Sequence, residues 1–264
     1  LSTDVTLTSP YFSRDDDHFY LVDNPVLKEH VFKSPMIRGS GWKGGLAAVA
    51  KKLVRENLGD FPQFARIWGL GSSEYRELVD SLGEEKQEKI REAVISFTLF
   101  ELGLNLDKND IDIIKNRPLD FLKRLSYDLT VRNAKEKALS PFLQPHKGRA
   151  IFYPTFFNKI SYEVINPHDR QRRAGINPVY YEVVPEDAKG KLQIIYVPHD
   201  AILTESAILK KQVEKDISFL CRAVERTAEE GIGAKTKLGW GRFKLDKKCY
   251  AASNDFTVEG WDRC

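Results

Sequence analysis

The C-terminal part of the sequence is organised by the stretch Gly231-Ile232-Gly233-Ala234-Lys235-Thr236-Lys237-Leu238-Gly239-Trp240-Gly241-Arg242-Phe243. The residues before it, 204–230, carry apolar side chains at helical spacing, with Thr204 as a candidate N-cap and Gly231 suited to the position just after the helix. Residues 241–245 have the composition of a strand. A long helix, a glycine-rich turn and a closing strand are therefore predicted in this order.

Upstream of that helix, four segments have the character of strands. They are residues 149–157, 161–165, 179–184 and 192–197. Turn-forming residues at Asn166-Pro167 and at 188–190 separate them. This half of the chain therefore predicts a sheet built from short, consecutive strands.

The N-terminal part begins in the same way. Residues 4–9 alternate apolar and polar side chains, which predicts a half-buried strand that stops at Pro10. Residues 11–35 show no sustained period and contain two X-Pro steps, so we expect an ordered functional loop. A glycine-rich turn at 38–43 then leads into a helix predicted over 47–57.

The middle of the chain differs from both ends because residues 60–140 carry helical spacing and many charges. Helices are predicted over 73–82, 84–102, 109–116 and 118–139. We interpret 60–145 as a helical insertion in a core made of residues 1–59 and 146–264. The core alone has the order β-α-β-β-α-β, which predicts an α+β fold with a ferredoxin-like (RRM-like) sheet covered on one face by two helices.

Composition sets the class of protein. The chain has 264 residues, of which 42% are hydrophobic and 30% charged, so it can bury a normal core and is neither fibrous nor disordered. Its apolar runs are too short to span a membrane and its first residues do not resemble a secretory signal, so we expect a cytoplasmic protein without a membrane partner. The net charge of +3, from 41 basic and 38 acidic residues, identifies no polyanionic partner, so local clusters of charge matter more.

The cysteine pattern gives a further expectation. Cys221, Cys249 and Cys264 are odd in number, widely spaced and without a CxxC pair. This pattern argues against a disulfide framework and against a structural zinc site. We therefore expect three reduced thiols.

The glycine-rich stretch has the composition of a phosphate-binding loop. Glycines let main-chain N–H groups approach phosphate oxygens, cations neutralise phosphate charge, and Trp240 offers a stacking face. The predicted contacts are Gly233, Lys235, Lys237, Gly239, Gly241 and Arg242. The spacing fits neither a P-loop nor a dinucleotide fingerprint. The alternative is a tight glycine turn between helix and strand, which requires no ligand.

Two other clusters could support the same chemistry. Gly39, Ser40 and Lys43 lie where a helix begins, a position that favours anions, although a capped helix start is the simpler interpretation. Arg170, Arg172 and Arg173 lie in a loop between two strands, where forked guanidinium groups can clamp a phosphate backbone. A solvated charged loop is the alternative for the arginines.

Six segments, taken in chain order, are similar to those of a known family. They are 21–28 (LVDNPVLK), 36–44 (MIRGSGWKG), 66–73 (RIWGLGSS), 148–152 (GRAIF), 166–182 and the glycine-rich 231–243. They resemble the D-N/S-P-V-I-K-D, I-P-G-S-S-L-K-G, L-F-G, G-R-L-x-F, thumb-hairpin and C-terminal glycine-rich segments of RAMP-superfamily backbone subunits in type III CRISPR effector complexes. The last segment is also similar to that of the subunit that caps Cmr-type complexes. The sequence departs from the family in having Thr8-Ser9-Pro10-Tyr11 instead of an H-I-G-G-like segment, and in its long insertion.

The resemblance implies an RRM-like fold, subunits stacked along a guide CRISPR RNA, and a thumb that intrudes between guide and target RNA so that one base pair is splayed. By its position in the matching motif, Asp23 would be the catalytic and metal-binding residue that cleaves target RNA. A carboxylate in such a loop can hold Mg²⁺, and His18 or His30 could shuttle protons. The alternative is a turn aspartate that bonds its own backbone. The run 15–17 of aspartates either recruits metal or repels RNA.

Three functional hypotheses follow. The chain is an RNA-binding subunit of a type III CRISPR effector complex in antiviral defence, which grips the guide backbone independently of sequence. It is an endoribonuclease whose Asp23 supports cleavage of the target RNA. Or it is an accessory subunit whose insertion, from about residue 74 to 140, contacts other complex members without cleaving RNA.

Overall fold

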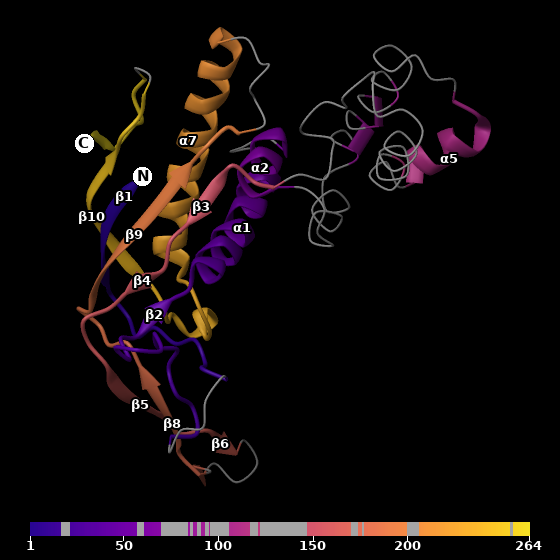
Figure 1. Ribbon diagram of the computed structural model, residues 1–264. Coiled ribbons are helices and arrows are strands. Elements are labelled where there is room, and N and C mark those ends of the chain that lie inside the picture. Colours follow the sequence, from indigo (N-terminus) through magenta and orange to yellow (C-terminus); the bar gives the residue numbers. More distant parts are fainter. Residues whose placement is uncertain are drawn as a thin grey trace. The chain divides into compact units, whose positions relative to one another are not determined.

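A computed structural model describes residues 1–16, 22–56, 61–69, 84, 87–88, 91–92, 95, 106–116, 121, 147–169, 174–175, 177–199, 206–253 and 256–264. The chain forms two compact units. The first consists of Leu1–Ala50, Ala150–Val197 and Ser206–Cys264, and the second of Lys51–Arg149 and Pro198–Glu205. The sheet and all segments described below as a candidate site belong to the first unit (Figure 1).

The first unit is built on a five-stranded sheet with the strand order β11-β10-β1-β9-β3. The strands are β1 Ser2–Leu7, β3 Ala150–Phe152, β9 Lys189–Tyr196, β10 Phe243–Tyr250 and β11 Asp262–Arg263. β1 lies in the centre and pairs antiparallel with both β9 and β10, and β3 pairs antiparallel with β9 (Figure 1). Only β11 runs parallel to its neighbour, β10.

Two helices cover one face of this sheet. They are α1 (Gly39–Arg55) and α7 (Ser206–Glu230). Val5 and Leu7 of β1 are buried on the covered face, where the α1 residue Trp42 places its ring edge-on to Phe243 of β10, with 5.6 Å between centroids. The core order β1-α1-β3-β9-α7-β10 is the predicted β-α-β-β-α-β arrangement, and the α+β class is confirmed.

A hairpin continues from the sheet. β2 (Met36–Ile37) pairs with β4 (Thr155–Phe156), and β5 (Ser161–Ile165) pairs antiparallel with β8 (Val179–Val183). At its far end the short strands β6 (His168–Asp169) and β7 (Ala174–Gly175) pair as well. Figure 1 shows this hairpin below the sheet, and it contains the segment 166–182 that the resemblance identified as a thumb.

The second unit is helical where it is described. α2 (Phe61–Trp68) and α5 (Lys108–Asn116) are its two described helices of several turns or less, and α5 starts with a reciprocal cap in which the Asp110 N–H donates to Asp107 Oδ1 at 2.7 Å. The described residues between 84 and 95 are helical as predicted, whereas the helix predicted over 73–82 and most of 84–102 and 118–139 lie outside the described residues. Among the described residues, no helix combines the length and apolar character needed to cross a bilayer.

Three predicted boundaries change because tertiary contacts decide them. α1 begins at Gly39, so the predicted glycine turn at 38–43 is the first turn of the helix. A Cβ on Gly39 would lie 2.2 Å from the carbonyl oxygen of Phe152, so this glycine permits the close approach of helix and strand. Gly190, predicted as part of a break, lies inside β9 because a Cβ there would lie 2.6 Å from Thr155 Cγ2. The predicted strand 149–157 divides into β3 and β4.

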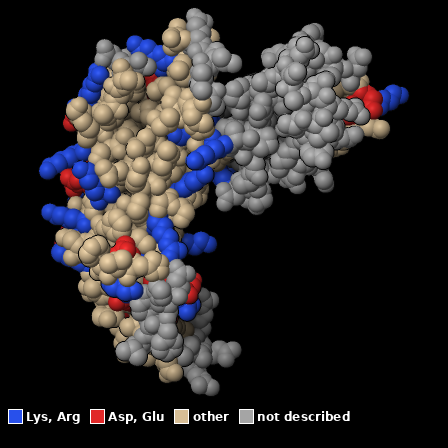
Figure 2. Space-filling model, in the orientation of Figure 1, with Lys and Arg blue, Asp and Glu red and all other residues tan. Residues whose placement is uncertain are grey.

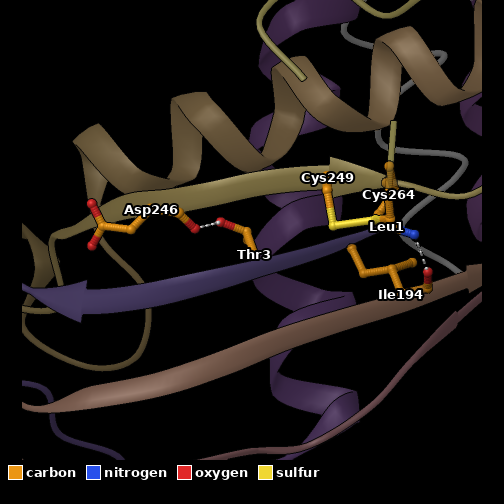
Figure 3. The surroundings of a disulfide bond; sticks show 6 residues. All are labelled: Leu1, Thr3, Ile194, Asp246, Cys249 and Cys264. Atoms are coloured by element: carbon orange, nitrogen blue, oxygen red, sulfur yellow. Dashed lines mark hydrogen bonds between the residues drawn. A yellow bond between two sulfur atoms is a disulfide. The ribbon is translucent and has the colours of Figure 1, made fainter. Parts of the chain in front are cut away.

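The expectation of three reduced thiols is wrong for two of them. Cys249 and Cys264 form a disulfide with 5.4 Å between their Cα atoms (Figure 3). The parallel pairing of β11 with β10 puts Asp262 opposite Cys249, and this brings the following Cys264 next to it, which spacing in the sequence could not show. Cys221 is free and buried in α7, and burial raises the pKa of its thiol to about 12.

Candidate nucleic-acid interface

Three segments that are far apart in the sequence meet where β10 begins. We call residues 9–12, 181–184 and 231–242 together the loop junction. The N–H of Gly241 donates to the carbonyl of Pro10 at 2.8 Å, and that of Ala234 to the carbonyl of Phe12 at 2.8 Å. Tyr11 and Val184 exchange two backbone hydrogen bonds of 2.8 and 2.9 Å. The junction is therefore held by the main chain of all three segments.

Steric contacts explain three of the glycines in the junction. A Cβ on Gly231 would lie 2.4 Å from the carbonyl oxygen of Trp240, and one on Gly241 would lie 1.9 Å from that of Ile232. A Cβ on Gly233 would lie 2.6 Å from the carbonyl oxygen of Phe12. All three also have positive φ angles, between 75° and 93°. These glycines are needed for the loop to pack on itself and on residues 10–12.

The backbone N–H groups of this loop are largely used within the protein. Those that donate to protein acceptors belong to Gly231, Ile232, Ala234, Leu238, Gly239, Trp240, Gly241 and Arg242. A phosphate cradle built from these N–H groups is therefore closed, and the tight glycine turn considered from the sequence describes them better. Contact with a polyanion falls to the cationic side chains of the loop.

Lys235 is the cation that the junction holds most firmly. Its backbone has a φ of 64°, and its Nζ lies 4.5 Å from the centroid of the Tyr181 ring and 6.0 Å from that of Trp240. Tyr181 and Trp240 meet edge-on at 6.0 Å, and Phe12 meets Tyr181 edge-on at 5.1 Å. Each segment of the junction thus contributes a ring to the setting of one ammonium group.

The other predicted cations of this loop are exposed. Lys237 lies in η2 (Thr236–Leu238), and Arg242 directly precedes β10, where its N–H donates to Ser9 Oγ at 2.9 Å. The first turns of α1 pack against the same loop, since a Cβ on Gly45 would lie 3.0 Å from the Ile232 side chain. Figure 1 shows η2 just below the N-terminal end of α1, where Lys43 is exposed. Lys43 and the loop cations therefore share one region of the first unit.

Of the predicted arginine cluster, Arg170, Arg172 and Arg173 all lie outside the described residues. The hairpin that carries them is described on both sides. Tyr162, Val164 and Tyr180 alternate with more buried neighbours on β5 and β8 and are 60%, 52% and 55% exposed. The contact of the arginines with RNA stays a prediction.

Asp23 lies in a segment that is bound side-on to β8. The N–H of Glu182 donates to the carbonyl of Asn24 at 2.9 Å, and Asn24 Nδ2 donates to the carbonyl of Tyr180 at 3.0 Å. Glu182 Oε2 accepts the Val26 N–H at 3.1 Å and pairs with Lys28 Nζ in a buried ion pair. Because residues 24–28 are fixed to the hairpin in this way, the exposed carboxylate of Asp23 has a fixed place beside β8.

The fit of a Mg²⁺ ion to this place is limited. Among the residues the structure describes, no three His, Cys, Asp or Glu side chains gather as a metal site, and the Asn24 amide is engaged with β8. Asp15 is buried, and Asp16 pairs with Arg14 at 3.1 Å. Asp17 and His18 lie outside the described residues, and His30 is exposed. Asp23 alone fits a largely hydrated Mg²⁺ whose remaining ligands come from water and phosphate.

The sequence-based search missed the basic side chains on the open face of the sheet. Lys189 of β9 and Lys244 of β10 flank Thr6 of β1 in direct register, and Lys191 lies opposite Asp4. The alternating run KGKLQI at 189–194 was the available signal. The open-facing positions of these three strands are Ser2, Asp4, Thr6, Lys189, Lys191, Gln193, Ile195, Lys244 and Asp246, and none is aromatic. In Figure 2, basic side chains gather at the edges of this unit around a broad tan surface.

Comparison with known proteins places the sequence in a family. The model of the RAMP superfamily matches residues 4–244. None of the curated proteins gives a match.

Among solved structures, one chain of a type III-B Cmr-beta complex bound to cognate target RNA is 12% identical with a TM-score of 0.48, and the match covers 93% of this chain and 58% of that chain. This chain thus spans less than two thirds of that relative. A chain of a type IV-B CRISPR complex is 13% identical with a TM-score of 0.45, over 98% and 93% of the two chains. Cmr6 from Pyrococcus furiosus is 14% identical with a TM-score of 0.38, over 93% and 97%.

Proposed function

This chain belongs to the RAMP superfamily, and from that membership we propose that it is an RNA-binding subunit of a CRISPR effector complex. In the finer form of the proposal, it grips the sugar-phosphate backbone of a guide CRISPR RNA within a cytoplasmic type III complex that acts in antiviral defence. The sequence segments that resemble type III backbone and capping subunits support this finer form.

The observation that carries the proposal is the loop junction. It holds Lys235 over two rings, leaves Lys237 and Arg242 exposed beside it, and packs against the start of α1 near Lys43. Cations fixed on a rigid main-chain frame suit a backbone that offers a phosphate at each nucleotide. The contacts use no base edge, so the grip is independent of sequence.

Salt dependence of RNA binding tests this grip. Affinity for unrelated single-stranded RNAs should fall with salt, with a log-log slope of roughly 0.7 for each phosphate neutralised. Lys235→Ala should weaken binding to all sequences about equally and reduce the slope by that amount, whereas Lys210→Ala, an exposed position on α7, should change neither. Binding that ignores salt contradicts the proposal. A chain that joins its complex but adds nothing to RNA affinity is instead the accessory subunit considered from the sequence.

Cleavage of target RNA is a second candidate function because Asp23 is exposed and fixed beside the hairpin. Mg²⁺, when bound there with phosphate, would stabilise the leaving oxygen. In the assembled complex, Asp23→Asn should abolish cutting and leave RNA affinity unchanged, while Asp112→Asn on α5 serves as the control. A variant or chelator-treated complex that cuts as fast as the wild type would exclude this role.

A further inference from the structure

A turn outside the loop junction presents two apolar side chains to solvent. Val31 is 77% exposed and Phe32 is 85% exposed, more than any other large apolar side chain that the structure describes. Burial of such side chains is normally favourable, so a pair displayed side by side at the tip of a turn indicates a contact made elsewhere.

The turn is held in one conformation. The Glu29 carboxylate accepts the N–H of Val31 at 2.9 Å and that of Phe32 at 2.6 Å. The Glu29 N–H donates to the carbonyl of Ser34 at 2.9 Å, and Lys33, with a φ of 54°, donates its N–H to the carbonyl of Glu29 at 3.1 Å. Because the tip is already ordered, the protein would lose little conformational entropy on binding through it.

The base of the turn is anchored in the folded unit. Lys28 and Pro35 form a bridge across it, and Lys28 is buried against Glu182 of the hairpin. The Met36 N–H donates to the carbonyl of Leu27 at 2.9 Å, which continues the pairing toward β2. The exposed tip therefore stands on a fixed support.

The charges of the turn do not suit a polyanion. Backbone hydrogen bonds from Val31 and Phe32 lower the pKa of the Glu29 carboxyl, so the carboxylate is ionised at neutral pH directly beneath the tip. Lys33 supplies one compensating positive charge. Val31 offers no flat π face on which a base could stack. An electrically balanced, apolar tip suits a protein surface better than RNA.

We propose that the turn 29–34 is a preformed knob that inserts Val31 and Phe32 into an apolar pocket of another protein in the complex. This contact is separate from the RNA grip proposed above, since it uses neither the loop junction nor its cations. A rigid aromatic anchor in a pocket is the usual form of an energetically dominant contact between proteins.

A crosslink from position 32 identifies what the tip touches. The probe is the effector complex purified through a tag on another subunit, with Phe32 replaced by the photocrosslinking residue p-benzoylphenylalanine. We expect a crosslinked peptide from a different protein chain, rich in apolar residues. A crosslink to RNA, to a second copy of this chain or to no other molecule overturns the proposal.

A side-chain truncation measures the contribution of the knob. Phe32→Ser should weaken association with the complex by about tenfold to a hundredfold. It should leave the thermal unfolding and RNA affinity of the isolated chain unchanged, because the side chain packs on little of its own fold. Ile208→Ser on α7, where Ile208 is 50% exposed, is the matched control and should have no effect. Equal association of both variants, or loss of RNA affinity in Phe32→Ser, contradicts the knob, whereas failure of the Lys235→Ala test would count only against the RNA grip.

Discussion

The two ends of strand β10 are held in different ways. At its start, the loop junction fits residues 231–242 against residues 9–12 by backbone hydrogen bonds and close approach at glycines. At its end, the Cys249–Cys264 disulfide joins β10 to the chain that returns beside it, close to Leu1 of the central region (Figure 3). One end depends on shape and the other on a covalent bond and on side chains.

The difference bears on function because the proposed RNA contacts lie at the start of the strand only. Main-chain packing there requires no oxidant and fixes the backbone that carries Lys235 and Arg242. The end of the strand carries the disulfide, with Trp261 buried beside it, and none of the predicted phosphate-contacting residues. Substitutions at the start should therefore affect RNA binding, and those at the end should affect stability alone.

The largest effect is expected from Gly241→Ala. The new Cβ would lie 1.9 Å from the carbonyl oxygen of Ile232, at a residue whose φ is +75°. Backbone strain and the steric clash together should lower the free energy of unfolding by about 3–5 kcal/mol, measured by urea denaturation. Gly239→Ala is the control, because its φ of +86° is similar but its Cβ would have open space. Its cost should be about 1–2 kcal/mol. Equal costs for the two variants would mean that close approach does not hold the junction.

The next effect concerns the opposite end of β10. The disulfide links residues separated by 15 positions, and a loop of this length is worth about 3 kcal/mol through its effect on the unfolded chain. Cys264→Ser should lower the free energy of unfolding by about this amount under oxidising conditions and by much less when a thiol reductant is present. RNA affinity should stay the same in both. A fall in RNA affinity would show that the two ends are coupled.

Local patterns predicted the elements whose limits are set locally. The alternation in 161–165 gave β5 with its observed ends, and the apolar spacing before Gly231 gave a helix that ends at Glu230 as observed. The start of α1 was misplaced because Gly39 is determined by its distance to Phe152, which lies more than a hundred residues further along the chain. The disulfide was missed for the same reason, since strand pairing brings its partners together.

The candidate site follows the same division. The sequence identified Lys235, Lys237 and Arg242 from composition, and the structure keeps them in one loop. It could not identify Phe12 and Tyr181 as the rings around Lys235, because these come from a first loop and a hairpin that meet only in the fold. The attachment of residues 24–28 to Glu182 was likewise invisible in the sequence.

A smaller effect should separate the two ends in binding. Arg242 directly precedes β10 and is exposed, and Lys247 lies further along the strand with its side chain 87% exposed. Arg242→Ala should weaken RNA affinity about fivefold to tenfold, corresponding to roughly 1 kcal/mol, because one phosphate contact is lost. Lys247→Ala removes the same charge and should have little effect. Equal losses, measured by fluorescence anisotropy at fixed salt, would show that overall charge and not the junction determines binding.

The smallest effect tests whether the disulfide or its neighbours hold the end of β10. Glu225 of α7 accepts Lys248 Nζ at 2.8 Å and Trp261 Nε1 at 3.1 Å, so it connects the helix, β10 and the returning chain. Glu225→Ala should lower the free energy of unfolding by about 0.5–1 kcal/mol, as expected for a partly exposed pair with one hydrogen bond.

The same substitution in the Cys264→Ser background decides between the two. If the returning chain separates from β10 without its covalent link, the Glu225–Trp261 hydrogen bond is already lost, and Glu225→Ala should then cost less than it does in the wild type. Full additivity would mean that Trp261, buried beside α7, keeps this segment in place by packing alone. The end of the strand would then resemble its start, where non-covalent contacts are sufficient.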